Sequence, residues 1–258
     1  MVLQNYLIER ILERIAASRF KKRFVLKGGV LVSSMLGLDV RTTMDLDLTA
    51  RRIPGTHEGL KAVFDEICAI ETGDYFVFTV MGIEDIRVSA EYPSIRLTLT
   101  ATFMTLRETL KIDVTSGDKI TPKEQVYAKK RLFDDGAFQV LAYNVETVLA
   151  EKLETLFSRG TQNTRMRDYY DIHMLATRND PPVNLKHLRM AFFATCKKRG
   201  TTRMIESCPA ILEAIRTDET MADFWKKYGR DFHFAAKISF ETVCNSIENL
   251  MANIMREK

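Results

Sequence analysis

Up to about residue 140, the apolar positions of the chain mix helical and strand spacings. Three stretches repeat apolar side chains at intervals of three and four residues, which predicts helices: residues 1–20, 30–38 and 57–70. Four stretches alternate polar with apolar residues or are rich in β-branched and aromatic ones, which predicts strands: Asp45–Leu48, Tyr75–Val80, Ile95–Phe103 and Thr109–Thr115. We expect Thr105–Glu108 to be the turn between the last two strands. This part is therefore predicted to be an α/β domain.

Beyond about residue 143 the pattern becomes helical. Asn144 is expected to cap a helix that ends near Ser158, and Gly160 suits its C-terminal end. Further helices are predicted at about 166–177, 184–198, 209–216, 219–228 and 236–256. The predicted fold class is α+β, with an N-terminal mixed-sheet domain at residues 1–142 and an all-helical domain at residues 143–258.

Composition and charge narrow the class of protein. Hydrophobic residues make up 46% and charged residues 28%, as in soluble globular domains, and no apolar run approaches the roughly 18–20 residues that cross a bilayer. The 38 Lys and Arg exceed the 34 Asp and Glu, and this net charge of +4 permits a nucleotide or nucleic-acid partner without requiring one. The four cysteines lack metal-ligand spacing, which favours free thiols and a cytoplasmic location.

Two aspartates give the first indication of chemistry. In a strand, Asp45 and Asp47 would point to the same face and repel each other, and a hard cation such as Mg²⁺ would remove that repulsion. An isolated Asp-x-Asp is more often an exposed pair on a half-buried strand. However, Gly28-Gly29 precedes a predicted helix, where backbone N–H groups can approach a phosphate closely. The combination favours a site for a metal ion and a phosphate.

A third aspartate strengthens this interpretation. Leu110, Ile112 and Val114 share one face of their predicted strand, so Asp113 faces the other way. Three carboxylates on neighbouring strands would complete a two-ion clamp, as used in phosphoryl transfer. In that scheme Asp113 would lie near the attacking hydroxyl group and help to deprotonate it.

These motifs together resemble the DNA polymerase β-like nucleotidyltransferase superfamily, and within it the AbiEii/AbiGii-type toxins of bacterial abortive-infection and toxin–antitoxin systems. Four segments in the right order carry the resemblance: Phe24-Val25-Leu26-Lys27-Gly28-Gly29, Arg41-Thr42-Thr43-Met44-Asp45-Leu46-Asp47, Ala150-Glu151-Lys152-Leu153 and Arg165-Met166-Arg167-Asp168-Tyr169-Tyr170-Asp171. They span about residues 20–180, and the later helices fit the helical half of the family.

The resemblance implies a Mg²⁺-dependent transfer of a nucleotide from an NTP. Asp45, Asp47 and Asp113 would hold two Mg²⁺ ions and form the catalytic centre. Lys152 matches the family's active-site lysine, which would contact the triphosphate, and Asp168 matches the catalytic aspartate of the fourth motif. The remaining candidates would bind the nucleotide: Lys27, Gly28, Gly29, Arg41, Arg165, Arg167 and Asp171.

The same resemblance suggests partners. The nucleotide would be GTP or a pyrimidine NTP, the acceptor an RNA such as tRNA, and the regulator a winged-helix antitoxin. Two other readings remain open, namely nucleotidyl transfer to a small molecule, as in antibiotic-modifying enzymes, and a non-catalytic NTP-binding signalling module. The three carboxylates count against the second, because a protein that only binds an NTP does not need them.

Overall fold

The computed structural model describes residues 2–37, 45–53, 55–86, 94–178, 180 and 182–256. These residues form two compact units. One unit comprises residues 2–34, 45–118 and 124–143, and the other comprises residues 35–37, 119–123 and 144–256. The short segment 119–123 thus belongs to the helical unit, although it lies between two strands of the sheet unit in the sequence.

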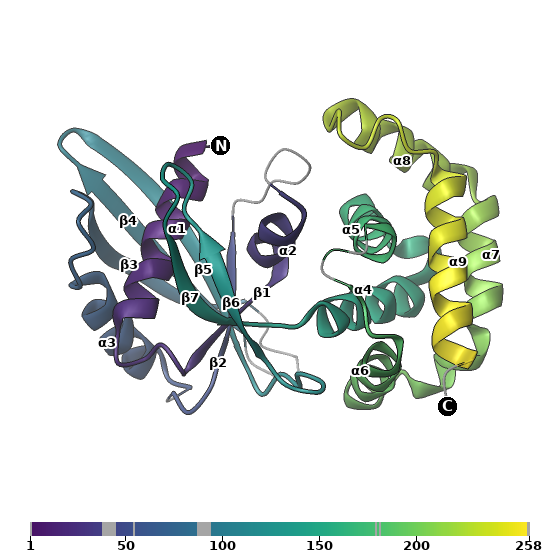
Figure 1. The fold of residues 1–258 in the computed structure, drawn as a ribbon, viewed down its shortest axis with the longest axis horizontal. Helices are drawn as coiled ribbons and strands as arrows, with labels where there is room; N and C mark the ends of the chain where they lie inside the picture. The colour runs from purple at the N-terminus through teal and green to yellow at the C-terminus, as the bar shows by residue number, and fades with distance from the viewer. Residues whose placement is uncertain are drawn as a thin grey trace. The chain divides into compact units, whose positions relative to one another are not determined.

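Within the described residues, seven strands form one mixed sheet in the order β3-β4-β5-β2-β1-β7-β6 (Figure 1). The strands are β1 Phe24–Lys27, β2 Leu46–Ala50, β3 Val77–Asp85, β4 Ser94–Phe103, β5 Leu106–Ser116, β6 Gln125–Lys130 and β7 Ala137–Ala142. β2 runs parallel to β5 and β1 parallel to β7, whereas all other neighbours are antiparallel. The predicted α+β class with a mixed sheet is confirmed.

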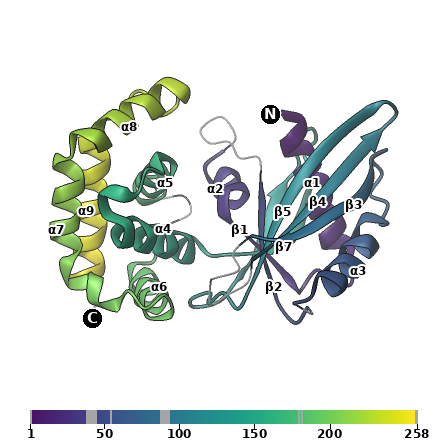
Figure 2. The same cartoon turned by 180° about the vertical axis from the view of Figure 1, so that it is seen from behind.

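Helices α1 (Val2–Ala17) and α3 (His57–Cys68) pack together on one face of the sheet, with α3 beside β3 (Figures 1 and 2). On this face, alternate residues are buried from Ile95 to Ala101 in β4 and from Leu110 to Val114 in β5. Apart from Ser94, which is buried, the opposite face of these strands carries polar side chains that are half-buried or exposed. Helix α2 (Gly28–Leu36) begins directly at the end of β1.

The β4–β5 hairpin turns earlier than the sequence predicts. Phe103 pairs with Leu106, so the turn consists of Met104 and Thr105 and not of Thr105–Glu108. Met104 is 84% exposed and has a positive φ of 51°, which is uncommon for a residue other than glycine. The early turn matters because it fixes which residue of β4 lies opposite each residue of β5.

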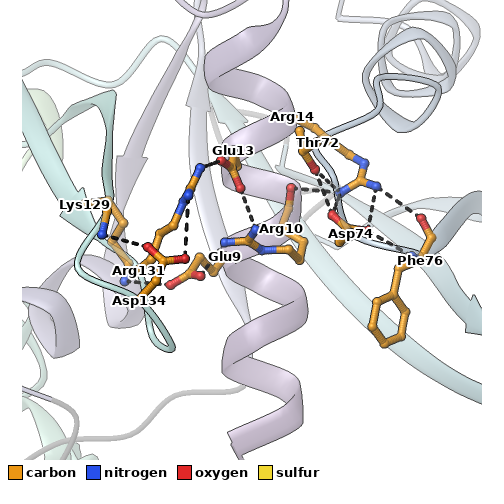
Figure 3. Close-up of polar contacts among 11 residues, drawn as sticks. Glu9, Arg10, Glu13, Arg14, Thr72, Asp74, Phe76, Lys129, Arg131 and Asp134 are labelled. Atoms are coloured by element: carbon orange, nitrogen blue, oxygen red, sulfur yellow. Dashed lines mark hydrogen bonds and ion pairs between the residues drawn. The ribbon is translucent and has the colours of Figure 1, made fainter.

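Helix α1 is more deeply buried than its amphipathic pattern predicts, since its charged residues are also covered (Figure 3). On one side, the Arg14 guanidinium donates to both oxygens of Asp74, at 2.6 and 2.9 Å, and to the carbonyl oxygen of Phe76. Burial alone would raise the pKa of Asp74, but the hydrogen bonds from Arg14, Thr72 and the Phe76 N–H outweigh it and lower that pKa. On the other side, Glu9, Arg10 and Glu13 form ion pairs that reach Lys129 and Arg131.

Arg14→Ala is expected to lower the free energy of unfolding by about 3–5 kcal/mol, because it leaves the Asp74 carboxylate buried and unpaired. Urea denaturation at neutral pH measures this loss. The matched control is Arg19→Ala, since Arg19 pairs with Glu66 at 2.6 Å but the two side chains are 72% and 50% exposed. Its loss should be about 0–1 kcal/mol. Equal losses for the two variants would contradict the role given to the buried pair.

Apart from residues 119–123 and its connecting segments, the second unit is helical. Its helices are α4 Val145–Arg159, α5 Met166–Thr177, α6 Leu185–Lys198, α7 Cys208–Thr217, α8 Glu219–Asp231 and α9 Phe240–Arg256, with short 3₁₀ turns at Gly160–Gln162 and Thr202–Ser207. The predicted cap at Asn144 is confirmed, because its side chain accepts from the Thr147 N–H at 2.7 Å. Its amide nitrogen also donates to the carbonyl oxygens of Thr121 and Lys123. Among the helices that the structure describes, none combines the length and apolar character needed to span a bilayer.

Candidate active site

Four charged residues form a row across four adjacent strands of the sheet. Lys27 of β1 lies opposite Asp47 of β2, Asp47 opposite Asp113 of β5, and Asp113 opposite Arg96 of β4. Directly opposite residues project from the same face of a sheet. The charges along this row therefore run positive, negative, negative, positive. Asp45 is exposed and lies immediately before β2, two residues ahead of Asp47.

Asp47 lies closest to the start of α2. The Gly29 N–H points to its carboxylate at 3.4 Å, so the helix N-terminus that we expect to bind a phosphate faces an aspartate in the structure. Burial raises the pKa of Asp47. The positive charge of Lys27 and the hydrogen bond from the Gly29 N–H lower this pKa, whereas repulsion from Asp113 and Asp45 raises it. The net shift is upward. The folded chain therefore holds this carboxylate where its negative charge is disfavoured.

Gly28 allows Asp47 to occupy this position. It has a φ of +62°, in the left-handed region that side chains rarely adopt. A Cβ atom built on Gly28 would lie 2.0 Å from Oδ2 of Asp47 and 2.5 Å from its Cγ. The glycine is therefore required twice, once by the backbone conformation and once by the carboxylate above it.

Arg96 orients the third carboxylate. Its Nε donates to Oδ1 of Asp113 at 2.7 Å and its Nη2 to Oδ2 at 2.8 Å, a bidentate ion pair between two neighbouring strands. Both side chains are partly exposed, at 24% and 19%. The hydrogen bond from Arg96 to Asp113 raises the pKa of the guanidinium, to which the charges of Asp45 and Glu84 also contribute.

Lys27 is held by a carboxylate that the motif analysis does not include. Its ammonium donates to Asp118 and to Thr115, both at 2.6 Å, and Thr49 donates to the same Asp118 oxygen at 2.7 Å. Burial alone would raise the pKa of Asp118. The attraction of Lys27 and the hydrogen bonds from Lys27, Thr115 and Thr49 outweigh burial and hold that pKa well below its ordinary value. Asp118 thus fixes the cation next to Asp47.

This network predicts a pH-dependent contribution to stability. A carboxylate whose pKa is lowered by folding stabilises the folded state above its unfolded pKa, and this contribution is lost as pH falls towards the folded pKa. Asp118→Asn should therefore unfold at lower urea concentration than the wild type at pH 7. The difference in the free energy of unfolding between the two proteins should shrink below about pH 4, by up to about 1.4 kcal/mol per pH unit. Urea denaturation of both proteins at several pH values measures this, and a constant difference would speak against the ion pair.

Mg²⁺ prefers carboxylate oxygens as ligands. Asp45, Asp47 and Asp113 supply such oxygens at neighbouring positions, and burial, followed by repulsion from Asp113 and Asp45, raises the pKa of Asp47. A divalent cation would remove that cost, so the donor chemistry fits. In the part of the chain that the structure describes, no three His, Cys, Asp or Glu side chains are close enough to hold a metal ion as they stand.

A second charged cluster lies within the helical unit. The Lys152 ammonium on α4 contacts Asp168 at 2.5 Å and Asp171 at 2.8 Å, both on α5. Burial alone would lower the pKa of Lys152, but the charges of Asp171 and Asp168 outweigh it and raise that pKa, so the ammonium stays charged. The structure therefore brings together three residues that the resemblance selects. Asp171 is fully buried, whereas the side chain of Asp168 is 16% exposed.

The arginines of this segment behave differently. Arg165 and Arg167 are exposed at the start of α5. Arg167 precedes Asp171 by four residues, but Arg167 is exposed whereas the Asp171 carboxylate is buried and pairs with Lys152. Arg41 lies outside the described residues.

Arg96 and Asp118 are the site residues that the sequence motifs miss. Arg96 would follow from the register of the β4–β5 hairpin, since its Cα partner is Asp113. Asp118 lies two residues beyond the end of β5 and carries no motif of its own. Only the fold, which places Thr49 and Thr115 side by side on parallel strands, shows that its carboxylate reaches Lys27.

Fold and site together define the class. The chain has a mixed sheet with carboxylates on adjacent strands, beside a helix that begins with two glycines, and it also has a helical unit. This is the arrangement of a nucleotidyltransferase. Two solved structures share the fold. JHP933 from Helicobacter pylori has a TM-score of 0.51 at 17% identity, over 99% of this chain and 93% of that one. A candidate nucleotidyltransferase from H. pylori has a TM-score of 0.52 at 15% identity, over 99% and 96%.

A family model identifies the family within this class. The model of the nucleotidyl transferase AbiEii toxin of type IV toxin–antitoxin systems matches residues 10–246. The chain therefore belongs to the AbiEii family of nucleotidyltransferases. A search of curated proteins gives no match to the chain.

Proposed function

We propose that this protein transfers a nucleotide from an NTP to a hydroxyl group of an RNA, with tRNA as the acceptor and Mg²⁺ as the cofactor. The observation that carries the proposal is the row Lys27, Asp47, Asp113 and Arg96, in which two carboxylates on adjacent strands lie between two cations. Family membership supports nucleotidyl transfer, and the name of the family supports a role as a toxin that is controlled by an antitoxin.

In this proposal the chain's own residues prepare the site before any substrate binds. Asp45, Asp47 and Asp113 would hold the metal, which would supply positive charge to the transferring phosphate. Arg96 keeps both oxygens of Asp113 oriented, and Asp118 keeps Lys27 next to Asp47. Asp113 would lie close to the attacking hydroxyl and accept its proton.

The helical unit contributes a separate cationic group. We assign Lys152 to the triphosphate of the NTP, with Asp168 and Asp171 as the carboxylates that orient its ammonium. Arg165 and Arg167, which are exposed on the same helix as Asp168, are assigned to phosphates of the nucleotide or of the RNA. Lys152→Ala should therefore raise the KM for the NTP.

The decisive experiment incubates the purified protein with Mg²⁺, total tRNA and each α-labelled NTP in turn. An Asp45→Asn, Asp47→Asn double variant and a reaction with EDTA run in parallel. Label on RNA only with the wild type and Mg²⁺ supports the proposal and identifies the nucleotide. Expression of the wild type without an antitoxin should also arrest bacterial growth, whereas the double variant should not.

Other outcomes select the alternatives. Label on a small acceptor but not on RNA would favour modification of a small molecule. Equal binding of the NTP by wild type and double variant, with no transfer to any acceptor, would show that the carboxylates are not catalytic. A signalling module would then replace the transferase as the leading interpretation.

A further inference from the structure

The face of β4 and β5 that does not pack on α1 and α3 is lined with hydroxyl groups and two cations. Moving away from Arg96 and Asp113, the cross-strand pairs on this face are Thr98 with Lys111, Thr100 with Thr109, and Thr102 with Arg107. These six residues are named here the hydroxyl face. Thr98, Thr100 and Thr102 are half-buried, and Lys111, Thr109 and Arg107 are exposed.

We propose that the hydroxyl face binds the backbone of a single-stranded end of the RNA acceptor and leads it to the carboxylate row. This inference rests on the proposed function and adds the surface on which the acceptor lies. The face is continuous with the candidate active site, because its first pair follows the Arg96–Asp113 pair by two residues on each strand.

The charge of the face suits a polyanion. Lys111 and Arg107 are exposed cations on the same face as Asp113, at increasing distance from it along β5. A phosphate backbone that approaches Asp47 and Asp113 would be repelled by their carboxylates, and these two cations would offset that repulsion. Arg96 adds no further positive charge, because it pairs with Asp113 and lies opposite Glu84 of β3.

The dimensions and chemistry favour a single strand of RNA. From Asp113 to Arg107 the chain advances six residues, or about 20 Å, whereas β4 and β5, which carry the face, lie about 5 Å apart. Such a narrow strip fits one extended strand of a few nucleotides. Threonine hydroxyls both donate and accept hydrogen bonds, so they can contact phosphates and the 2′-hydroxyl of ribose. The six residues include no aromatic side chain, so the face would hold the backbone and leave the bases free.

Salt-dependent binding tests the cations. Fluorescence anisotropy with a labelled single-stranded RNA of about 12 nucleotides would be measured between about 50 and 200 mM KCl. Removing two phosphate contacts should reduce the slope of log Kd against log salt by about 1.4 for a single strand. We expect this change for the Arg107→Ala, Lys111→Ala double variant. The control is the Lys21→Ala, Lys22→Ala double variant. Lys21 and Lys22 precede the first residue of β1, whereas Lys27 is the last residue of that strand. Its slope should equal that of the wild type.

The threonines are tested by an isosteric change. Thr100→Val combined with Thr109→Val keeps the shape and strand preference of both positions but removes the hydroxyls. It should weaken binding of the RNA at least threefold more than binding of a DNA of the same sequence. Equal loss for RNA and DNA would overturn the contact with the 2′-hydroxyl.

These experiments distinguish a failure of RNA binding at the hydroxyl face from a failure of nucleotide transfer. If wild-type protein labels tRNA but the slope of the Arg107, Lys111 variant is unchanged, the acceptor lies elsewhere and the hydroxyl face is overturned. If the slope changes as expected but no NTP is ever transferred, the face stands as an RNA-binding surface and the proposed activity falls. No binding of RNA by the wild type would overturn the face as an RNA site.

Discussion

Gly28→Ala is expected to reduce nucleotide transfer at least about 100-fold, since displacing a catalytic group by about 1 Å is enough for such a loss. The new methyl group would lie 2.0 Å from Oδ2 of Asp47, so the carboxylate must move out of the row. Alanine at a φ of +62° should also cost about 1–2 kcal/mol of stability. Single-turnover transfer to RNA and urea denaturation would measure the two effects.

The control for Gly28 is Gly73→Ala. Gly73 has a φ of +76°, but a Cβ atom there would meet nothing within 4 Å. This variant should lose a similar amount of stability and keep its transfer rate. If both variants lose transfer to the same extent, the loss at Gly28 comes from backbone strain and not from displacement of Asp47.

Asp47→Asn is expected to lower the rate of transfer about 1,000-fold or more and at the same time to raise the Tm of the protein without metal. The loss of rate follows because the carboxylate would contribute several kcal/mol through the bound metal, and about 1.36 kcal/mol corresponds to a factor of ten. The gain in stability follows from the raised pKa of Asp47. Burial is the largest cause of the raised pKa. Lys27 and the Gly29 N–H oppose it, and repulsion from Asp113 and Asp45 adds to it. A neutral amide relieves this penalty at neutral pH.

Thermal unfolding with and without Mg²⁺ separates the two roles of Asp47. A ligand at about 100 times its Kd stabilises a folded protein by about 2.7 kcal/mol, so Mg²⁺ should raise the Tm of the wild type and leave that of Asp47→Asn nearly unchanged. Asp118→Asn provides the contrast, because the pKa of Asp118 is lowered and its loss should reduce the Tm at pH 7. A lower Tm for Asp47→Asn in the absence of metal would refute the idea that the folded chain disfavours this charge.

Local features of the fold could be predicted from the sequence because their causes lie within a few residues. Asn144 caps α4 through the N–H three residues later, and Gly160 follows its last turn with a φ of 52°. Helical periodicity likewise predicted α3 and α5 to within two residues of their observed ends. In contrast, β6 and β7 were not predicted, because apolar and polar residues do not alternate regularly in QVYAKK and AFQVLA, although the more and less exposed positions of the folded strands do.

Non-local partners could not be predicted, because they depend on register. A turn at Thr105–Glu108 would place Thr100 opposite Asp113, whereas the observed turn places Arg96 there. The motifs selected Lys27, Asp47 and Asp113 as separate candidates, and only the strand order β5-β2-β1 aligns them in one row. The burial of Glu9 and Arg14 was also not predicted. The spacing of apolar residues identifies the apolar side of α1, but it does not indicate which other elements cover its charged side.

The segment 119–123 limits how modular this protein is. It belongs to the helical unit, and its Thr121 and Lys123 carbonyl oxygens accept from the Asn144 side chain that caps α4. A chimera joined at the Tyr143–Asn144 bond would place that cap against the other parent's copy of the segment, whose carbonyl oxygens accept from Asn144 only if its backbone follows the same path. Recombination between relatives should therefore give folded proteins only when residues 119–123 and the helical unit come from the same parent. Because this segment lies between two strands of the sheet unit, we expect the two units to be exchanged together.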